Sequence, residues 1–167
     1  ASDSTSPPPP TVAADLAPEV EFRNTAPITI SDSSPAAPYP STINVSGVGN
    51  VTGVKVTING FSHTWPYDID MLLVGPGGQK LIIQSDAGGS GTVSNVNYTI
   101  DDAAAAVMPS DAFPATGTSV RPTNNGADDP FATPAPAGPY GNPAPAGTAT
   151  LNGTFAGTSG NGAWNLY

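Results

Sequence analysis

The stretch that decides the fold runs from Gly60 to Ile83 and reads GFSHTWPYDIDMLLVGPGGQKLII. Apolar residues fill positions 72–74 and 81–83, and a Gly-Pro-Gly-Gly turn separates the two runs. This pattern predicts two strands joined by a tight turn. Asp68 and Asp70 lie two positions apart, so we expect their carboxylates on one side of the first strand. Acidic side chains placed there need a cation or another partner.

The composition favours strands, turns and loops over helices. The chain of 167 residues contains 20 Pro and 19 Gly, and only 10% of its residues are charged. This length, with an apolar fraction of 38%, allows one domain with a single sheet-on-sheet core. Alternating apolar and polar residues predict half-buried strands at 20–23, 28–30, 43–45, 54–58, 148–151 and 163–167. We therefore predict an all-β antiparallel sandwich with a long irregular loop over about 109–147.

The first part of the chain differs from the rest. Residues 1–18 are interpreted as a Pro-rich arm or linker, because Pro7 to Pro10 favour an extended polyproline segment that builds no core. The domain then covers residues 19–167. No apolar run approaches the roughly 20 residues of a membrane span, and Ala1 suits the start of a processed chain. We expect a secreted or cell-surface protein of bacterial origin.

The net charge and the absence of certain residue types exclude several classes of function. Thirteen acidic residues against four basic ones give a net charge of -9, which leaves no basic patch for nucleic acid but suits divalent cations. The chain has no cysteine, which excludes disulfides and thiolate chemistry. His63 is the only histidine, and no Gly-x-Ser-x-Gly elbow accompanies it, so we predict no enzyme activity.

Acidic residues near the predicted strand ends indicate a shared calcium site, because calcium takes six to eight oxygen ligands. Gly88 and Gly89 favour such a site, since glycine lets backbone carbonyls approach an ion. The alternative is that these residues only cap turns or contact water. A second cation contact, or a solvated acidic turn, is expected at Asp128-Asp129. The predicted calcium ligands are Asp68, Asp70, Asp86, Asp101 and Asp102.

Aromatic residues suggest a different kind of site. A flat platform of aromatic rings would bind sugars by stacking. The alternative is that the rings fill the core or anchor loops, and that Trp164 belongs to the core. The platform residues would be Trp65, Tyr67, Tyr39 and Tyr140.

The order of these motifs resembles the P domain, also called the Homo B domain, that follows the catalytic domain in proprotein convertases and many bacterial subtilases. The matching segments are His63-Thr64, Tyr67 to Asp70, Leu73 to Gly78, and Asn161 to Leu166. The resemblance covers about 28–167 and implies a jelly-roll β-sandwich. Family members continue past the Trp strand into one further strand that this sequence lacks. That difference implies either an end-truncated chain or a sheet with an open edge.

Two functions remain open. The first is a calcium-stabilised, non-catalytic module with a structural, assembly or adhesive role, forming homo-oligomers through the N-terminal arm or an open sheet edge by strand exchange. Val12, Leu16, Val20 and Phe22 are the apolar residues that the arm region would contribute. The alternative is a carbohydrate- or protein-binding accessory domain of a secreted protease or other hydrolase, as the resemblance implies.

Overall fold

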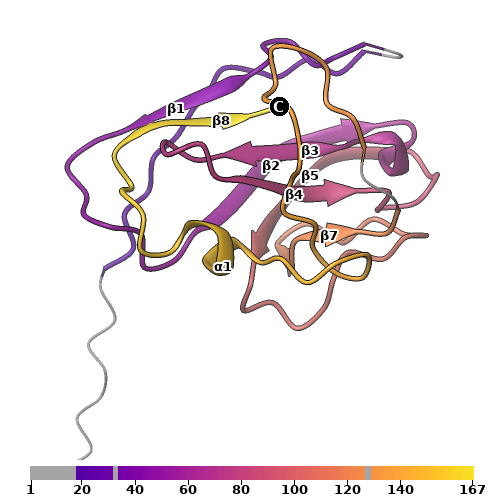
Figure 1. Ribbon diagram of the computed structural model, residues 1–167. Helices are drawn as coiled ribbons and strands as arrows, with labels where there is room; N and C mark the ends of the chain where they lie inside the picture. The colour runs from indigo at the N-terminus through magenta and orange to yellow at the C-terminus, as the bar shows by residue number, and fades with distance from the viewer. Residues whose placement is uncertain (1–17, 32–33, 127–128) are drawn as a thin grey trace, which may run out of the picture.

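The computed structural model describes residues 18–31, 34–126 and 129–167. These residues form two β-sheets and almost no helix, which confirms the all-β class (Figure 1). The predicted arm lies outside the described residues except for Pro18. The elements are β1 (Ser41–Val45), β2 (Lys55–His63), η1 (Pro66–Asp68), β3 (Met71–Val74), β4 (Lys80–Ser85), β5 (Val93–Asp101), β6 (Thr118–Val120), β7 (Thr123–Asn124), α1 (Leu151–Phe155) and β8 (Gly162–Leu166).

The larger sheet is built around the predicted hairpin. Its strand order is β1-β8-β3-β4-β7, and only the β4–β7 pair is parallel. The turn between β3 and β4 closes with hydrogen bonds from Gly75 N to Gln79 O (2.9 Å) and from Gly78 N to Gly75 O (2.9 Å). Gly78 has a φ of +83°, a conformation that side chains disfavour and glycine tolerates. The Gly-Pro-Gly-Gly sequence therefore sets the register of the hairpin.

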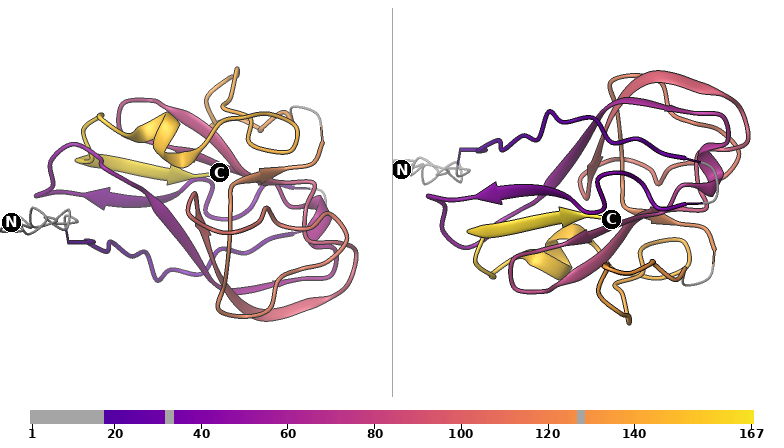
Figure 2. Two further views of the ribbon diagram at one scale, coloured as in Figure 1. Left: turned by 90° about the horizontal axis from the view of Figure 1, so that it is seen from below. Right: turned by 90° about the horizontal axis from the view of Figure 1, so that it is seen from above.

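The smaller sheet has the strand order β2-β5-β6 and forms the second layer (Figure 2). β2 and β5 are antiparallel, whereas β5 and β6 are parallel. Both sheets are thus mixed, and the purely antiparallel arrangement that we expected is wrong. The short strands β6 and β7 lie within the stretch 109–147 that was predicted to be one irregular loop, so that part of the prediction is wrong. The chain between β7 and α1 is long and irregular, as predicted.

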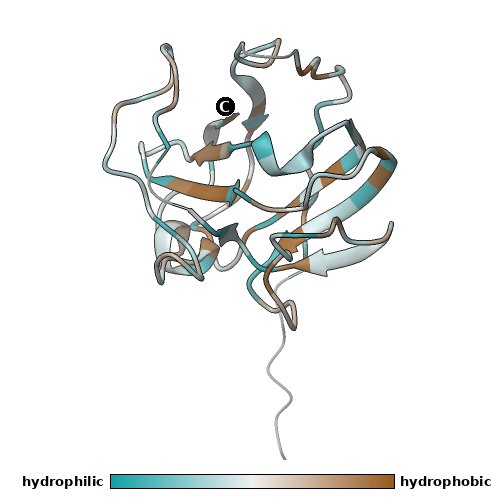
Figure 3. Ribbon diagram, turned by 90° about the vertical axis from the view of Figure 1, so that its right-hand side faces the viewer, coloured by the Kyte–Doolittle hydropathy of each residue, from teal (hydrophilic) through white to brown (hydrophobic). Residues whose placement is uncertain are grey.

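The core lies between the two sheets. Leu73, Leu81 and Ile83 of the larger sheet meet Tyr98 and Ile100 of the smaller one in a single buried cluster. Apolar residues accordingly concentrate along the strands in Figure 3. Phe155 of α1 is fully buried in the same cluster, where its ring lies 5.1 Å from that of the half-buried Trp164. This placement confirms the core role of Trp164.

A second apolar cluster covers the outer face of the larger sheet. Leu72, Val74 and Ile82 point away from the main core and are covered by Ala135, with Phe131 and Tyr140 at the margin. The long loop supplies all three of these covering residues. Both faces of the hairpin are therefore buried, which explains why its strands read as continuous apolar runs.

Some of the predicted strands are absent from the described residues. Residues 20–23 form no strand there, and the segment 28–30 contributes only a single bridge from Thr29 to Ala37. Residues 148–151 were predicted as a strand, but Leu151 begins the helix α1. That prediction is wrong because Thr150 accepts a hydrogen bond from Gly153 N and caps the helix.

Candidate functional site: the acidic cluster at Ser85

The acidic cluster, defined here as Asp70, Asp86 and Asp129 around Ser85, lies at one end of the β3–β4 hairpin. Asp70 immediately precedes β3, Ser85 ends β4, and Asp86 follows it. The Ser85 hydroxyl lies 2.7 Å from Asp70 Oδ1 and 2.6 Å from Asp129 Oδ2. Asp129 reaches this position from the loop that crosses the outer face of the sheet. Ser85 and Asp129, which are 44 positions apart in sequence, thus lie within hydrogen-bond distance of each other.

The Ser85 hydroxyl cannot satisfy both carboxylates. A hydroxyl carries one hydrogen and donates it to one acceptor at a time. The second carboxylate oxygen must then face an oxygen lone pair at hydrogen-bond distance. This arrangement is stable only when one carboxyl group carries a proton or when a positive charge lies beside the cluster.

The electrostatics of the cluster agree with this reasoning. Burial raises the pKa of Asp70 from 3.8 to about 6, and the charges of Asp129 and Asp86 add to the rise, while the Ser85 hydrogen bond opposes it. Burial, and then the charge of Asp129, also raises the pKa of Asp86, with a smaller contribution from Asp68. Asp70 is only partly buried and keeps contact with solvent, which screens part of this repulsion. Asp70 and Asp86 therefore hold their protons more tightly than isolated carboxylates do.

Local backbone structure positions the Asp86 carboxylate. Asp86 adopts a φ of +50°, and its carbonyl accepts a 3.0 Å hydrogen bond from Asn125 Nδ2. A Cβ atom at Gly126 would lie 1.7 Å from Asp86 Oδ2, so only glycine leaves room for the carboxylate. Asn125 thus holds the backbone of Asp86, and Gly126 leaves space for its carboxylate.

Asp68 lies at the rim of the cluster and not on a strand. Pro66 begins the 3-10 turn η1, which contains Asp68, and β3 starts only at Met71. The predicted strand positions of Asp68 and Asp70 are therefore wrong, because Pro fixes the backbone for a turn. Asp68 remains close enough to contribute to the pKa of Asp86.

Asp101 and Asp102 have other partners, away from Ser85. The Asp101 carboxylate lies 3.5 Å from Lys55 Nζ and accepts a hydrogen bond from Ala103 N. The Asp102 carboxylate accepts hydrogen bonds from Leu151 N (2.9 Å) and Asn152 N (2.7 Å) at the start of α1. Asp102 therefore ties the helix to the end of β5. The structure does not bring these two residues together with Asp68, Asp70 and Asp86.

The sequence pattern predicted a second, separate cation contact at Asp128-Asp129. In the structure Asp129 belongs to the acidic cluster itself, whereas Asp128 lies outside the described residues. Among the described residues, no group of three or more His, Asp or Glu side chains is arranged to hold a metal ion as it stands. The cluster does offer carboxylate and hydroxyl oxygens, which are the ligands that calcium prefers. A bound cation would thus bring the carboxylates of the acidic cluster closer together around Ser85.

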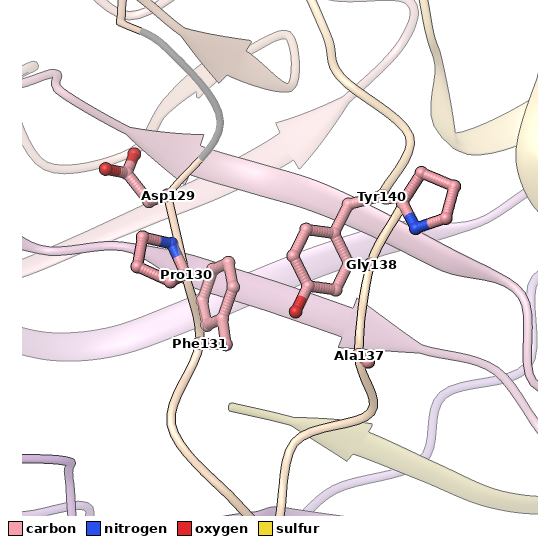
Figure 4. Close-up of a pocket in the computed structure, with 7 residues that line it drawn as sticks. Asp129, Pro130, Phe131, Ala137, Gly138 and Tyr140 are labelled. Atoms are coloured by element: carbon pink, nitrogen blue, oxygen red, sulfur yellow. The ribbon is translucent and has the colours of Figure 1, made fainter.

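The loop slot, defined as the depression between residues 129–131 and 137–140, adjoins the acidic cluster. It has a volume of about 380 Å³. The rings of Phe131 and Tyr140 point toward one another from the two arms of the loop, with centroids 5.4 Å apart, while the Asp129 carboxylate points away from them (Figure 4). Lys80 Nζ lies 5.7 Å from the Tyr140 ring centroid and donates to Ala137 O. The slot is therefore mainly apolar.

The predicted aromatic platform does not form. Tyr39 packs edge-on against Tyr167, and Tyr140 packs against Phe131. Trp65 is 49% exposed, and within the described part of the chain its ring contacts no other aromatic ring. The backbone N–H of Trp65 donates to His63 Nδ1 (3.1 Å), so this histidine has a local hydrogen-bonding role beside Trp65.

Comparison with protein-family models, curated proteins and solved structures found no match. The resemblance to the P domain therefore stays a prediction. No helix in the described ranges is long and apolar enough to cross a membrane.

Sequence reasoning missed Ser85 as the centre of the site. The only signal was the polar pair Gln84-Ser85 at the end of an apolar run, directly before Asp86. Nothing local indicated that Asp129 folds back onto Ser85.

Proposed function

We propose that this chain is a secreted, non-catalytic β-sandwich module of jelly-roll type that is stabilised by calcium and has a structural role. The observation that carries the proposal is that the carboxylates of Asp70 and Asp129 both lie within hydrogen-bond distance of the Ser85 hydroxyl, with Asp86 beside them. Like charges held this close destabilise the fold unless a proton or a cation neutralises them. The net charge of -9 adds to the need for cations.

The residues of the cluster fit calcium by their chemistry. Asp70, Asp86 and Asp129 would hold the ion, with the Ser85 hydroxyl as a neutral oxygen ligand. Asp68 at the rim would bind through water, because calcium completes its coordination shell with solvent. The bound ion would supply positive charge that links β3, β4 and the long loop, and thereby stabilise the hairpin end. No reaction is assigned to the ion.

The test is thermal unfolding with and without calcium at about pH 7.5. A ligand that binds only the folded state raises the melting temperature, so we expect a higher melting temperature in calcium than in EDTA. Asp70→Asn should abolish the difference. Asp111→Asn removes the same charge from an exposed site outside the cluster and should retain the difference. Equal melting temperatures of the wild-type chain in EDTA and calcium would refute the proposal.

A second role, assembly between chains, is favoured by the edge of the smaller sheet. β2 is nine residues long and pairs only with β5 within the described residues. The free edge of a strand of this length offers a row of backbone donors and acceptors to another chain. The half-buried Val56 and Ile58 lie on this strand. We propose that a strand of a second copy pairs with β2.

The cross-strand pair Thr57 and Thr99 offers a matched test, because the two side chains share one face and their hydroxyls lie 3.0 Å apart. Thr57→Lys places a charge on the edge strand, whereas Thr99→Lys places it on the central strand. Sedimentation should show an oligomer that Thr57→Lys dissociates and Thr99→Lys retains. A monomer at all concentrations contradicts this role.

A further inference from the structure

We propose that Asn59 is a site of spontaneous deamidation, at which water converts the side-chain amide to a carboxylate. The sequence contains four Asn-Gly pairs, which begin at positions 59, 125, 152 and 161. Such pairs favour deamidation because glycine has no Cβ to hinder the attack of its nitrogen on the preceding side chain. The four pairs differ in how the fold holds the asparagine side chain.

The reaction needs an asparagine side chain that is free to rotate. The backbone nitrogen of Gly60 attacks Cγ of Asn59, the Cγ–Nδ2 bond breaks, and the amide nitrogen leaves as ammonia with the proton from Gly60. Water then opens the succinimide ring. Addition of water at Cγ gives aspartate, whereas addition at the main-chain carbonyl carbon gives isoaspartate, in which the chain continues through the former side chain.

Hydrogen bonds hold three of the four asparagine side chains away from the following nitrogen. Asn125 Nδ2 donates to a backbone carbonyl (3.0 Å). Asn152 lies in α1, and its Oδ1 accepts from Val54 N (3.3 Å). Asn161 is held twice, since its Oδ1 accepts from Val48 N (3.0 Å) and its Nδ2 donates to Val48 O. These bonds must break before the amide can react.

Asn59 is not held in this way. Its side chain is exposed, and among the described residues it forms no hydrogen bond. Neither Asn59 nor Gly60 has a register partner in β5, because the register shifts between Ile58 and Phe61. Gly60 has a φ of +69°, which marks this irregularity in β2. Since the ladder is locally interrupted at a bulge, the backbone is less constrained there than in the paired part of the strand.

One contact opposes the reaction at Asn59 but does not distinguish it from the other sites. Gly60 N donates to Asn97 Oδ1 (2.7 Å), and this hydrogen bond is lost when the nitrogen attacks. The nitrogens of Gly126 and Gly153 likewise donate to side-chain oxygens (2.8 and 2.9 Å). The freedom of the asparagine side chain therefore decides which pair reacts.

Deamidation changes the edge strand β2 in two ways. It adds a negative charge to a chain whose net charge is already -9. Isoaspartate also lengthens the main chain by the side-chain methylene and so displaces the two halves of β2 relative to β5. Both changes weaken the pairing of β2 with a second copy. This consequence rests on the proposed assembly role, whereas the deamidation itself does not.

The test is incubation of the full folded chain in mildly alkaline buffer, followed by peptide mapping with mass spectrometry. Asn59 should deamidate at least about fivefold faster than each of the other three asparagines, because each of those must first break a hydrogen bond. In concentrated urea the hydrogen bonds are lost, and all four pairs should react at similar rates. The folded chain and the unfolded chain thus form a matched comparison with the same sequence.

Two variants identify the site independently of the mapping. Anion exchange of the incubated chain should show a new, more acidic species, which Asn59→Gln should remove and Asn125→Gln should retain. The proposal is overturned if Asn59 in the folded chain reacts no faster than the other three asparagines, or if Asn59→Gln leaves the acidic species in place. A chain that deamidates at Asn59 but sediments as a monomer before incubation would contradict the assembly role alone.

Discussion

Replacing Asp70 by Asn should stabilise the calcium-free protein at neutral pH. The pKa of Asp70 rises from 3.8 to about 6 in the folded chain, chiefly through burial and also through Asp129 and Asp86. Because the folded-state pKa is raised, protonation of Asp70 stabilises the fold. This stabilisation is complete below about pH 3.9 and is lost as the pH rises through about 6.

The size of the effect follows from this pKa. The rise to about 6 corresponds to at most about 3 kcal/mol. Since Asp70 is only partly buried, solvent screening reduces the effect to about 1 kcal/mol. Asn keeps an oxygen acceptor for the Ser85 hydroxyl and removes the charge. The variant should therefore gain about 1 kcal/mol at about pH 7.5 in EDTA, and at most half of that gain at about pH 4.

Urea unfolding at the two pH values, in EDTA, measures both numbers. Asp111→Asn is the matched control and should change the free energy of unfolding by less than about 0.5 kcal/mol. A variant Asp70→Asn that is less stable than the wild-type chain at about pH 7.5 would refute the reasoning. Such a result would mean that the carboxylate is stabilising in its charged form and that the crowding around Ser85 carries no cost.

Three further predictions concern neighbouring residues. Gly126→Ala should displace the Asp86 carboxylate, because a Cβ would lie 1.7 Å from its Oδ2; calorimetry should show weaker calcium binding, while urea unfolding changes little. Asp102→Ala removes the acceptor for Leu151 N and Asn152 N and should cost about 1–2 kcal/mol by urea unfolding, equally in EDTA and calcium; a lost calcium response would contradict its structural role. Phe155→Ala empties a fully buried site and should cost about 3–5 kcal/mol by the same method; a loss below about 1 kcal/mol would exclude a core role.

The hairpin was predictable from sequence because each of its determinants is local. The apolar runs at 72–74 and 81–83 and the turn at 75–78 need no distant partner to be interpreted. β5 was missed although part of its pattern is local, since Val96, Tyr98 and Ile100 alternate with polar residues. The alternation is interrupted at Asn95, which has a φ of +54°, and the β2–β5 register shifts near Phe61.

The acidic cluster was only partly predictable. Asp70 and Asp86 flank the hairpin, and their proximity follows from the pairing of β3 with β4. Asp129 arrives through a loop whose path depends on the packing of Phe131 and Tyr140 on the outer face of the sheet. Asp102 resembled a metal ligand in sequence, but its two hydrogen bonds at α1 depend on a helix about 50 residues away. Such nonlocal contacts leave no local pattern.

The most direct test of the central claim is a calorimetric titration of the full chain with calcium at about pH 7.5. The account predicts saturable binding to the wild-type chain, at least about tenfold weaker binding to Asp70→Asn, and unchanged binding to Asp111→Asn. The absence of binding heat, together with identical melting in EDTA and calcium, would contradict the claim that this fold is stabilised by calcium.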